Sequence, residues 1–162
     1  MADWVYTEMI VTGDENEIVR FIEDSRCPHP VQDGEGRWRM QSDEEASELS
    51  FWSAVAPDDL TAYFSSPGTS LPYDNPNAAR PWNIENWGTK WDAREVETDV
   101  NDRLDGTVAY LFSTPYSAPF GYLDAVVAKW PSLRFQVSWS DEEGYGAELD
   151  GEGGELREVE EW

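Results

Sequence analysis

Alternating apolar and polar positions mark the strands that this chain is expected to form. Residues 3–12 carry apolar side chains on both faces, which predicts a central strand that is covered in part on each side and ends at Gly13. Cleaner alternation over residues 107–113 and 133–139 predicts two further strands, each with one apolar face. Weaker patterns predict additional strands over residues 37–40, 48–56 and 95–98.

Helical spacing of apolar residues occurs between these strands. Asp14 resembles the start of a capping box and predicts a helix that stops before Pro28. Ser117, as a cap with Pro119 in the first turn, predicts a second helix with an apolar stripe. A short helix at 58–64 is expected to open an otherwise irregular stretch.

The order strand-helix-strand occurs twice, which predicts an α+β fold of the ferredoxin-like βαβ-βαβ kind, with two helices on an antiparallel sheet. We expect one domain over residues 1–162, long enough to bury a substantial core. Residues 58–92 are expected to form an irregular Trp-rich insertion. Residues 141–162 are expected to form an acidic C-terminal hairpin that turns near Asp150-Gly151 or Gly153-Gly154.

The most unusual stretch is Trp82–Asp92, which holds three of the nine tryptophans of the chain. The Trp spacings of five and four fit neither a strand nor one clean helical face, so we expect a fixed irregular segment. It could be a structural clasp, in which Trp87 and Trp91 pack on a sheet face and Lys90 pairs with a carboxylate. It could instead be a site, in which indoles stack on a base and basic side chains neutralise a phosphate. The candidate binding residues are Trp82, Asn86, Trp87, Thr89, Lys90, Trp91, Asp92 and Arg94.

The string NWGTKWD at residues 86–92 resembles the signature of the YubB/Api92-like ferredoxin-fold family of phage and plasmid proteins. The resemblance covers most of the chain and weakens over about residues 25–48 and 58–80. It implies a ferredoxin-like fold and a setting in a mobile element, and it implies no activity. Its other landmarks are Asp3-Trp4 in a strand ending at Gly13, Phe112-Ser113-Thr114, Ser117-Ala118-Pro119 and the closing acidic hairpin.

The charge balance is strongly acidic, with 34 acidic against 11 basic residues and a net charge of −23. Such a field opposes direct binding to nucleic acid or anionic membranes and favours basic partners. Three explanations remain open: solubility through self-repulsion, adaptation to a high-salt host, and a surface that mimics the phosphate charge of DNA.

Candidate chemistry is sparse. Cys27 is the single cysteine, so no internal disulfide is possible, and His29, the single histidine, lies between two prolines; both are interpreted as loop residues. The chain holds no glycine-rich phosphate-binding motif. Residues 141–152 match an EF-hand loop in part, but Tyr145 occupies a ligand position, so we expect no dedicated calcium site. No catalytic residue, metal site or cofactor is predicted.

These observations favour a non-enzymatic accessory protein of a phage or other mobile element. Through its acidic surface it would bind and inhibit a basic host protein, such as a defence or nucleic-acid-handling factor, in the cytoplasm of the host cell. The alternative is a small-ligand binder that sequesters a nucleotide signal at residues 82–92. No apolar run is long enough to span a bilayer, so no membrane partner is expected.

Overall fold

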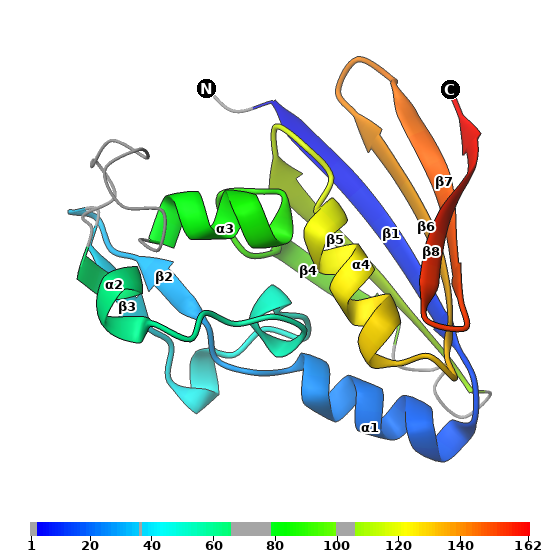
Figure 1. Ribbon diagram of the computed structural model, residues 1–162, viewed down its shortest axis with the longest axis horizontal. Coiled ribbons are helices and arrows are strands. Elements are labelled where there is room, and N and C mark those ends of the chain that lie inside the picture. The colour runs from blue at the N-terminus through cyan, green and yellow to red at the C-terminus, as the bar shows by residue number, and fades with distance from the viewer. Residues whose placement is uncertain (1–2, 36, 66–78, 100–105) are drawn as a thin grey trace.

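A computed structural model describes residues 3–35, 37–65, 79–99 and 106–162 of the chain. They form an α+β fold in which α-helices pack on one face of a six-stranded sheet (Figure 1). Short 3₁₀ turns lie at Asp43–Glu45 and Phe51–Ser53. The elements are β1 (Trp4–Thr12), α1 (Glu15–Ser25), β2 (Pro30–Gln32), β3 (Trp38–Met40), α2 (Leu60–Ser65), α3 (Ala79–Trp87), β4 (Arg94–Asp99), β5 (Thr107–Pro115), α4 (Phe120–Lys129), β6 (Arg134–Asp141), β7 (Gly146–Glu152) and β8 (Glu155–Glu161).

The strand order in the main sheet is β4-β5-β1-β6-β7-β8, and neighbouring strands pair antiparallel. Strand β1 is central, with Met9 opposite Tyr110 of β5 and Val137 of β6. The expected central strand is therefore confirmed. Its two faces differ, because Met9 is fully buried beneath the helices whereas Tyr6 on the other face is 49% exposed. In the described part of the chain, helices cover only the face that carries Met9.

The core lies between this face and helices α1 and α4. Its members alternate along the strands and recur at helical spacing in the helices, as burial of one face of each element requires. The Phe51 and Tyr122 rings stack at a centroid distance of 4.3 Å near its centre. The largest fully buried side chains are Trp87, Tyr63, Tyr110, Tyr122, Phe21, Phe51 and Phe135.

Several local predictions are confirmed. The Asp14 carboxylate accepts hydrogen bonds from the N–H groups of Asn16 and Glu17, at 3.1 and 3.2 Å, and so caps α1. The C-terminal hairpin turns at Gly153-Gly154, where both residues have positive φ values of 63° and 84° that glycine adopts without steric strain. The strands expected at 37–40 and 95–98 are β3 and β4, and the helix expected at 58–64 is α2.

The predicted strand at residues 48–56 is wrong, because the chain instead makes a 3₁₀ turn at Phe51–Ser53. The Ser50 hydroxyl accepts a hydrogen bond from the Trp52 N–H at 3.2 Å, and the Phe51 N–H donates to the Asp92 carboxylate at 2.6 Å. These backbone donors are therefore satisfied by side chains and do not pair with a strand. The apolar run predicts burial correctly, since Leu49 and Phe51 are both fully buried.

The stretch predicted to be irregular, residues 58–92, contains α2 and α3. Ala79, Asn83 and Trp87 are buried at four-residue spacing along one face of α3. Because the middle position is a polar asparagine, the apolar pattern hides the helical period. Residues 66–78 of the same stretch, and residues 100–105 further along the chain, lie outside the described residues.

The expected cap of the second helix is also wrong. Pro119 occupies the cap position of α4 and makes no side-chain cap, whereas the Ser117 hydroxyl donates to the backbone oxygen of Gly88 at 2.6 Å. Ser117 therefore joins the start of α4 to the end of α3. Gly121, in the first turn, lies so close to α3 that a Cβ would meet the backbone oxygen of Asn86.

Candidate functional site

The first part of the Trp-rich segment, from Asn83 to Trp87, packs into the protein interior through these two side chains. Asn83 is fully buried, and its Oδ1 accepts a hydrogen bond from the Tyr63 hydroxyl at 2.8 Å while its Nδ2 donates to the Lys90 backbone oxygen at 2.9 Å. The buried Trp87 indole donates to the Val55 oxygen at 2.9 Å. These groups have their partners within the protein, as buried polar groups require. This part of the segment is a clasp.

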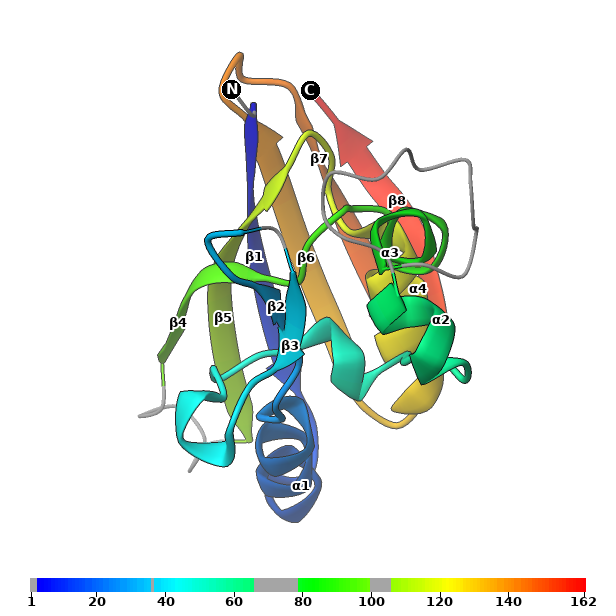
Figure 2. The same cartoon turned by 90° about the vertical axis from the view of Figure 1, so that its left-hand side faces the viewer.

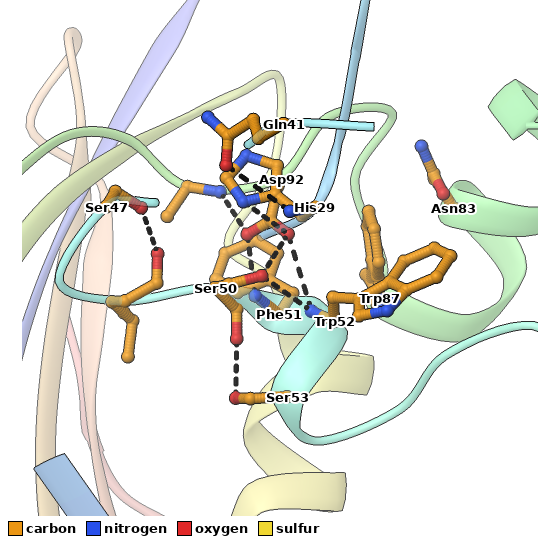
Figure 3. Close-up of polar contacts among 12 residues, drawn as sticks. His29, Gln41, Ser47, Ser50, Phe51, Trp52, Ser53, Asn83, Trp87 and Asp92 are labelled. Carbon is orange, nitrogen blue, oxygen red and sulfur yellow. Dashed lines mark hydrogen bonds and ion pairs between the residues drawn. The ribbon is translucent and has the colours of Figure 1, made fainter. Parts of the chain in front are cut away.

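Asp92 closes the same clasp from the other end of the segment (Figure 3). It is 5% exposed, and its carboxylate accepts four hydrogen bonds: from the N–H groups of Phe51 (2.6 Å), Ala93 (2.8 Å) and Trp52 (3.4 Å), and from the Ser50 hydroxyl (2.9 Å). One side chain thus ties the 3₁₀ turn to the chain that enters β4.

Three other predicted site residues also have structural contacts. Asn86 donates from Nδ2 to the Trp82 oxygen at 3.0 Å, and Thr89 is buried with its hydroxyl 3.5 Å from the Pro115 oxygen. The Trp82 ring meets Tyr63 and Trp87 edge to face. Trp82, Asn86, Trp87 and Thr89 do not line the cavity described next.

Figure 2 shows the β2–β3 hairpin in front of β4 and β5. A cavity of about 340 Å³ is lined by residues of this hairpin and of the chain entering β4. We call it the Trp91 cavity. Of the eight predicted site residues, Trp91, Asp92 and Arg94 line it. The structure adds His29, Trp38 and Gln41, which sequence reasoning did not assign to a site. Trp38 lies in the strand expected at residues 37–40, but nothing in a single sequence brings that strand to Trp91.

Basic side chains surround Trp91. The Lys90 Nζ lies 4.5 Å from the centre of the Trp91 ring and 4.9 Å from that of Tyr116, and the Arg94 guanidinium lies 5.1 Å from the Trp91 ring. Within the described residues Lys90 forms these contacts with rings and no ion pair with a carboxylate, contrary to the clasp interpretation of this residue. Burial, and to a lesser extent the charge of Arg80, lowers the pKa of Lys90.

His29 is a buried loop residue, only 5% exposed. Its Nδ1 lies 3.8 Å from Oδ2 of Asp92, beyond hydrogen-bond distance, and has no hydrogen-bond partner in the described part of the chain. Burial raises the pKa of the neighbouring Cys27 thiol, which works against a reactive thiolate.

A second hollow, of about 660 Å³, lies on the sheet face away from the helices. Strands β1, β6, β7 and β8 form it, and we call it the acidic hollow. Asp150 pairs there with Arg134 (3.2 Å) and Arg157 (3.8 Å). Its remaining carboxylates, Glu8, Glu148 and Glu158, form no ion pair with a described residue.

Within the described residues, no group of three or more His, Cys, Asp or Glu side chains is placed to hold a metal ion. The helices in the same part of the chain are too short or too polar to cross a bilayer. The described residues offer two candidate binding surfaces, the Trp91 cavity and the acidic hollow.

The comparisons with known proteins bear on the fold. No family model matches the chain, and no curated protein matches it. The structure is similar to the crystal structure of the protein Api92 from Yersinia pseudotuberculosis, with a TM-score of 0.64 at 8% sequence identity over 100% of this chain and 98% of that chain. The chain therefore has an Api92-like fold.

Proposed function

We propose that this is a non-enzymatic binding protein that engages and inhibits a basic host protein through the acidic hollow. The observation that carries the proposal is the set of three glutamates, Glu8, Glu148 and Glu158, which line the hollow without a cationic partner among the described residues. The net charge of −23 extends the negative field around them. Complementary charge of this kind accelerates encounter and selects basic partners.

The setting in a phage or other mobile element, and a target in host defence or nucleic-acid handling, form part of this proposal. The setting rests on the NWGTKWD resemblance, and the kind of target rests on the acidic charge of the chain. The strand order β4-β5-β1-β6, with α1 following β1 and α4 following β5, supports the ferredoxin-like plan. The carboxylate-lined hollow on the open sheet face would bind the basic surface with which the host protein otherwise binds DNA phosphates.

Displacement of DNA tests this function. A basic nucleoid-type protein is bound to a labelled DNA duplex, and release of the duplex is followed as this protein is added at low and at high salt. We expect release that weakens as salt rises, because screening reduces the attraction between exposed charges. Release that is independent of salt would contradict a surface that acts by charge mimicry.

A pair of variants with the same net charge separates the hollow from the overall field. The triple variant Glu8→Gln, Glu148→Gln and Glu158→Gln should no longer displace the DNA duplex from the basic protein. The control, Glu23→Gln, Glu44→Gln and Glu142→Gln, neutralises three exposed carboxylates elsewhere and should retain it. Equal losses in the two variants would contradict the hollow as the binding surface.

A second candidate function is the sequestering of a small nucleotide, which the Trp91 cavity favours because it combines two indoles with an arginine. Native mass spectrometry of the protein purified from a cell extract, beside a denatured control, tests it. A discrete extra mass that is lost on denaturation is expected, and a bare polypeptide would contradict it.

A further inference from the structure

The Trp91 cavity lies beside an unusual concentration of positive charge. Arg37, Arg39, Lys129, Arg134 and Arg157 each form an ion pair with a carboxylate. By contrast, Lys90 and Arg94, which both lie against the Trp91 ring, form none with any described residue. In a chain with 34 acidic residues, two cations on one tryptophan without an ion pair to a described carboxylate create a local site for an anion.

The backbone places Arg94 in the lining of this cavity. The pairing of β4 with β5 shifts register between Arg94 and Glu97, and Glu95 adopts a left-handed φ of 53°. This conformation is uncommon for a residue other than glycine, and bulges of this kind re-aim side chains next to binding sites. The Trp91 ring then holds the guanidinium at 5.1 Å.

The opposite wall offers hydrogen-bonding groups. With Nδ1 of His29 turned toward Asp92, Nε2 on the other side of the ring is the nitrogen left to meet a ligand (Figure 3). Asp92 itself is saturated by its four donors. Gln41 accepts from the His29 backbone N–H through Oε1 at 3.3 Å, so its amide NH₂ remains to donate. Trp38, half-buried on β3, adds an aromatic surface.

We propose that the Trp91 cavity binds a nucleoside monophosphate. The base lies against Trp38, its polar edge meets His29 and Gln41, and the phosphate lies at Arg94, with the charge of Lys90 close by on the Trp91 ring. Trp91 acts as a positioning residue that holds the two cations. This inference rests on the second candidate function and names the ligand class of that site.

Size and charge favour a single nucleotide over a longer polyanion. The volume of about 340 Å³ lies at the lower end of the roughly 300–1,000 Å³ found for ligand pockets. The Glu95 carboxylate also lines the cavity, and the protein as a whole is strongly negative, so a polymer leaving the cavity would meet repulsion. A monophosphate remains within the reach of the local cations.

Isothermal titration calorimetry tests the proposal with the full-length protein stripped of ligand by refolding. The probes are the four 5′-ribonucleoside monophosphates, the matching nucleosides and inorganic phosphate. At least one monophosphate should bind more tightly than its nucleoside and than phosphate alone. Arg94→Gln should weaken that binding by about 10- to 100-fold, as expected for the loss of a hydrogen bond to a charged group.

The control is Arg20→Gln, an exposed arginine of α1 without an ion pair to any described residue, which should bind as the wild type does. Unchanged affinity in Arg94→Gln, or binding of nucleosides as tight as that of monophosphates, would overturn the assignment. Native mass spectrometry of the unstripped protein distinguishes a failure of the proposed ligand class from a failure of the sequestering function. A lost mass that is a nucleotide other than a monophosphate overturns the ligand class and keeps the sequestering function, whereas a lost mass that is not a nucleotide, or a bare polypeptide that binds no probe, overturns both.

Discussion

Replacement of Asp92 by alanine should destabilise the protein strongly, because this carboxylate holds the Trp-rich segment to the 3₁₀ turn. It accepts hydrogen bonds from three backbone N–H groups and the Ser50 hydroxyl, all in an interior where Asp92 is only 5% exposed. A buried donor left without an acceptor costs about 1–3 kcal/mol. The contacts from Phe51 (2.6 Å) and Ala93 (2.8 Å) are the shortest, so they dominate the loss.

We count the cost of an unpaired donor in full for Phe51 and Ala93, and only in part for Trp52 and Ser50, because these two groups can turn toward water or each other. The free energy of unfolding should then fall by about 3–5 kcal/mol. A loss of that size lowers the melting temperature by roughly 6–20 °C in a domain of this length. Asp92→Asn should cost less, about 1–2 kcal/mol, since its Oδ1 still accepts from Phe51 and Ala93.

Urea unfolding at fixed salt, followed by tryptophan fluorescence, measures these differences. Asp124→Ala removes one exposed carboxylate from α4 and controls for the change in net charge, with an expected effect within about 0.5 kcal/mol. An Asp92→Ala variant that unfolds within 1 kcal/mol of this control would refute the reasoning that Asp92 is the clasp of the segment.

Three further predictions follow from single contacts. The Arg39 guanidinium lowers the pKa of Glu45 from 4.5 to about 2, so the stabilisation from this pair is fully present above 4.5 and is lost as the pH falls from there through 2. Carboxyl NMR should show a Glu45 midpoint near 2 that rises in Arg39→Ala; an unchanged midpoint would contradict this cause. Gly121→Ala should cost about 1–3 kcal/mol by pushing α4 from α3, while Gly34→Ala, which meets nothing, should not; equal stabilities in thermal denaturation would contradict this packing. Burial raises the pKa of Cys27, so its thiol should react with a disulfide reagent at neutral pH at least tenfold more slowly in the folded than in the urea-unfolded protein, and equal rates would count against it.

The parts of the fold that follow from local patterns could be predicted from the sequence. The alternation in β1, β5 and β6 and the Asp14 cap of α1 are local signals, and the structure confirms them. The α3 helix was missed because Asn83 interrupts its buried face, and the turn at Phe51–Ser53 was missed because its backbone donors bind Asp92, about 40 residues away in sequence.

The candidate site could be predicted only in part, for the same reason. Trp91, Asp92 and Arg94 lie within the segment that the sequence singles out, and all three line the cavity. The opposite wall comes from His29 and Trp38, which reach the segment through the β2–β3 hairpin. That juxtaposition is a tertiary contact, and no spacing within one sequence encodes it.

The central claim is that one Trp-rich segment is divided into a buried clasp and an open binding wall. A two-dimensional ¹H–¹⁵N NMR spectrum resolves the indole N–H of each tryptophan, and comparing it before and after addition of a nucleoside monophosphate tests that division directly. The signals of Trp38 and Trp91 should move, whereas that of Trp87, whose indole donates to the Val55 oxygen, should stay in place. Movement of Trp87 to the same extent, or a spectrum in which Trp38 and Trp91 do not move, would contradict the claim.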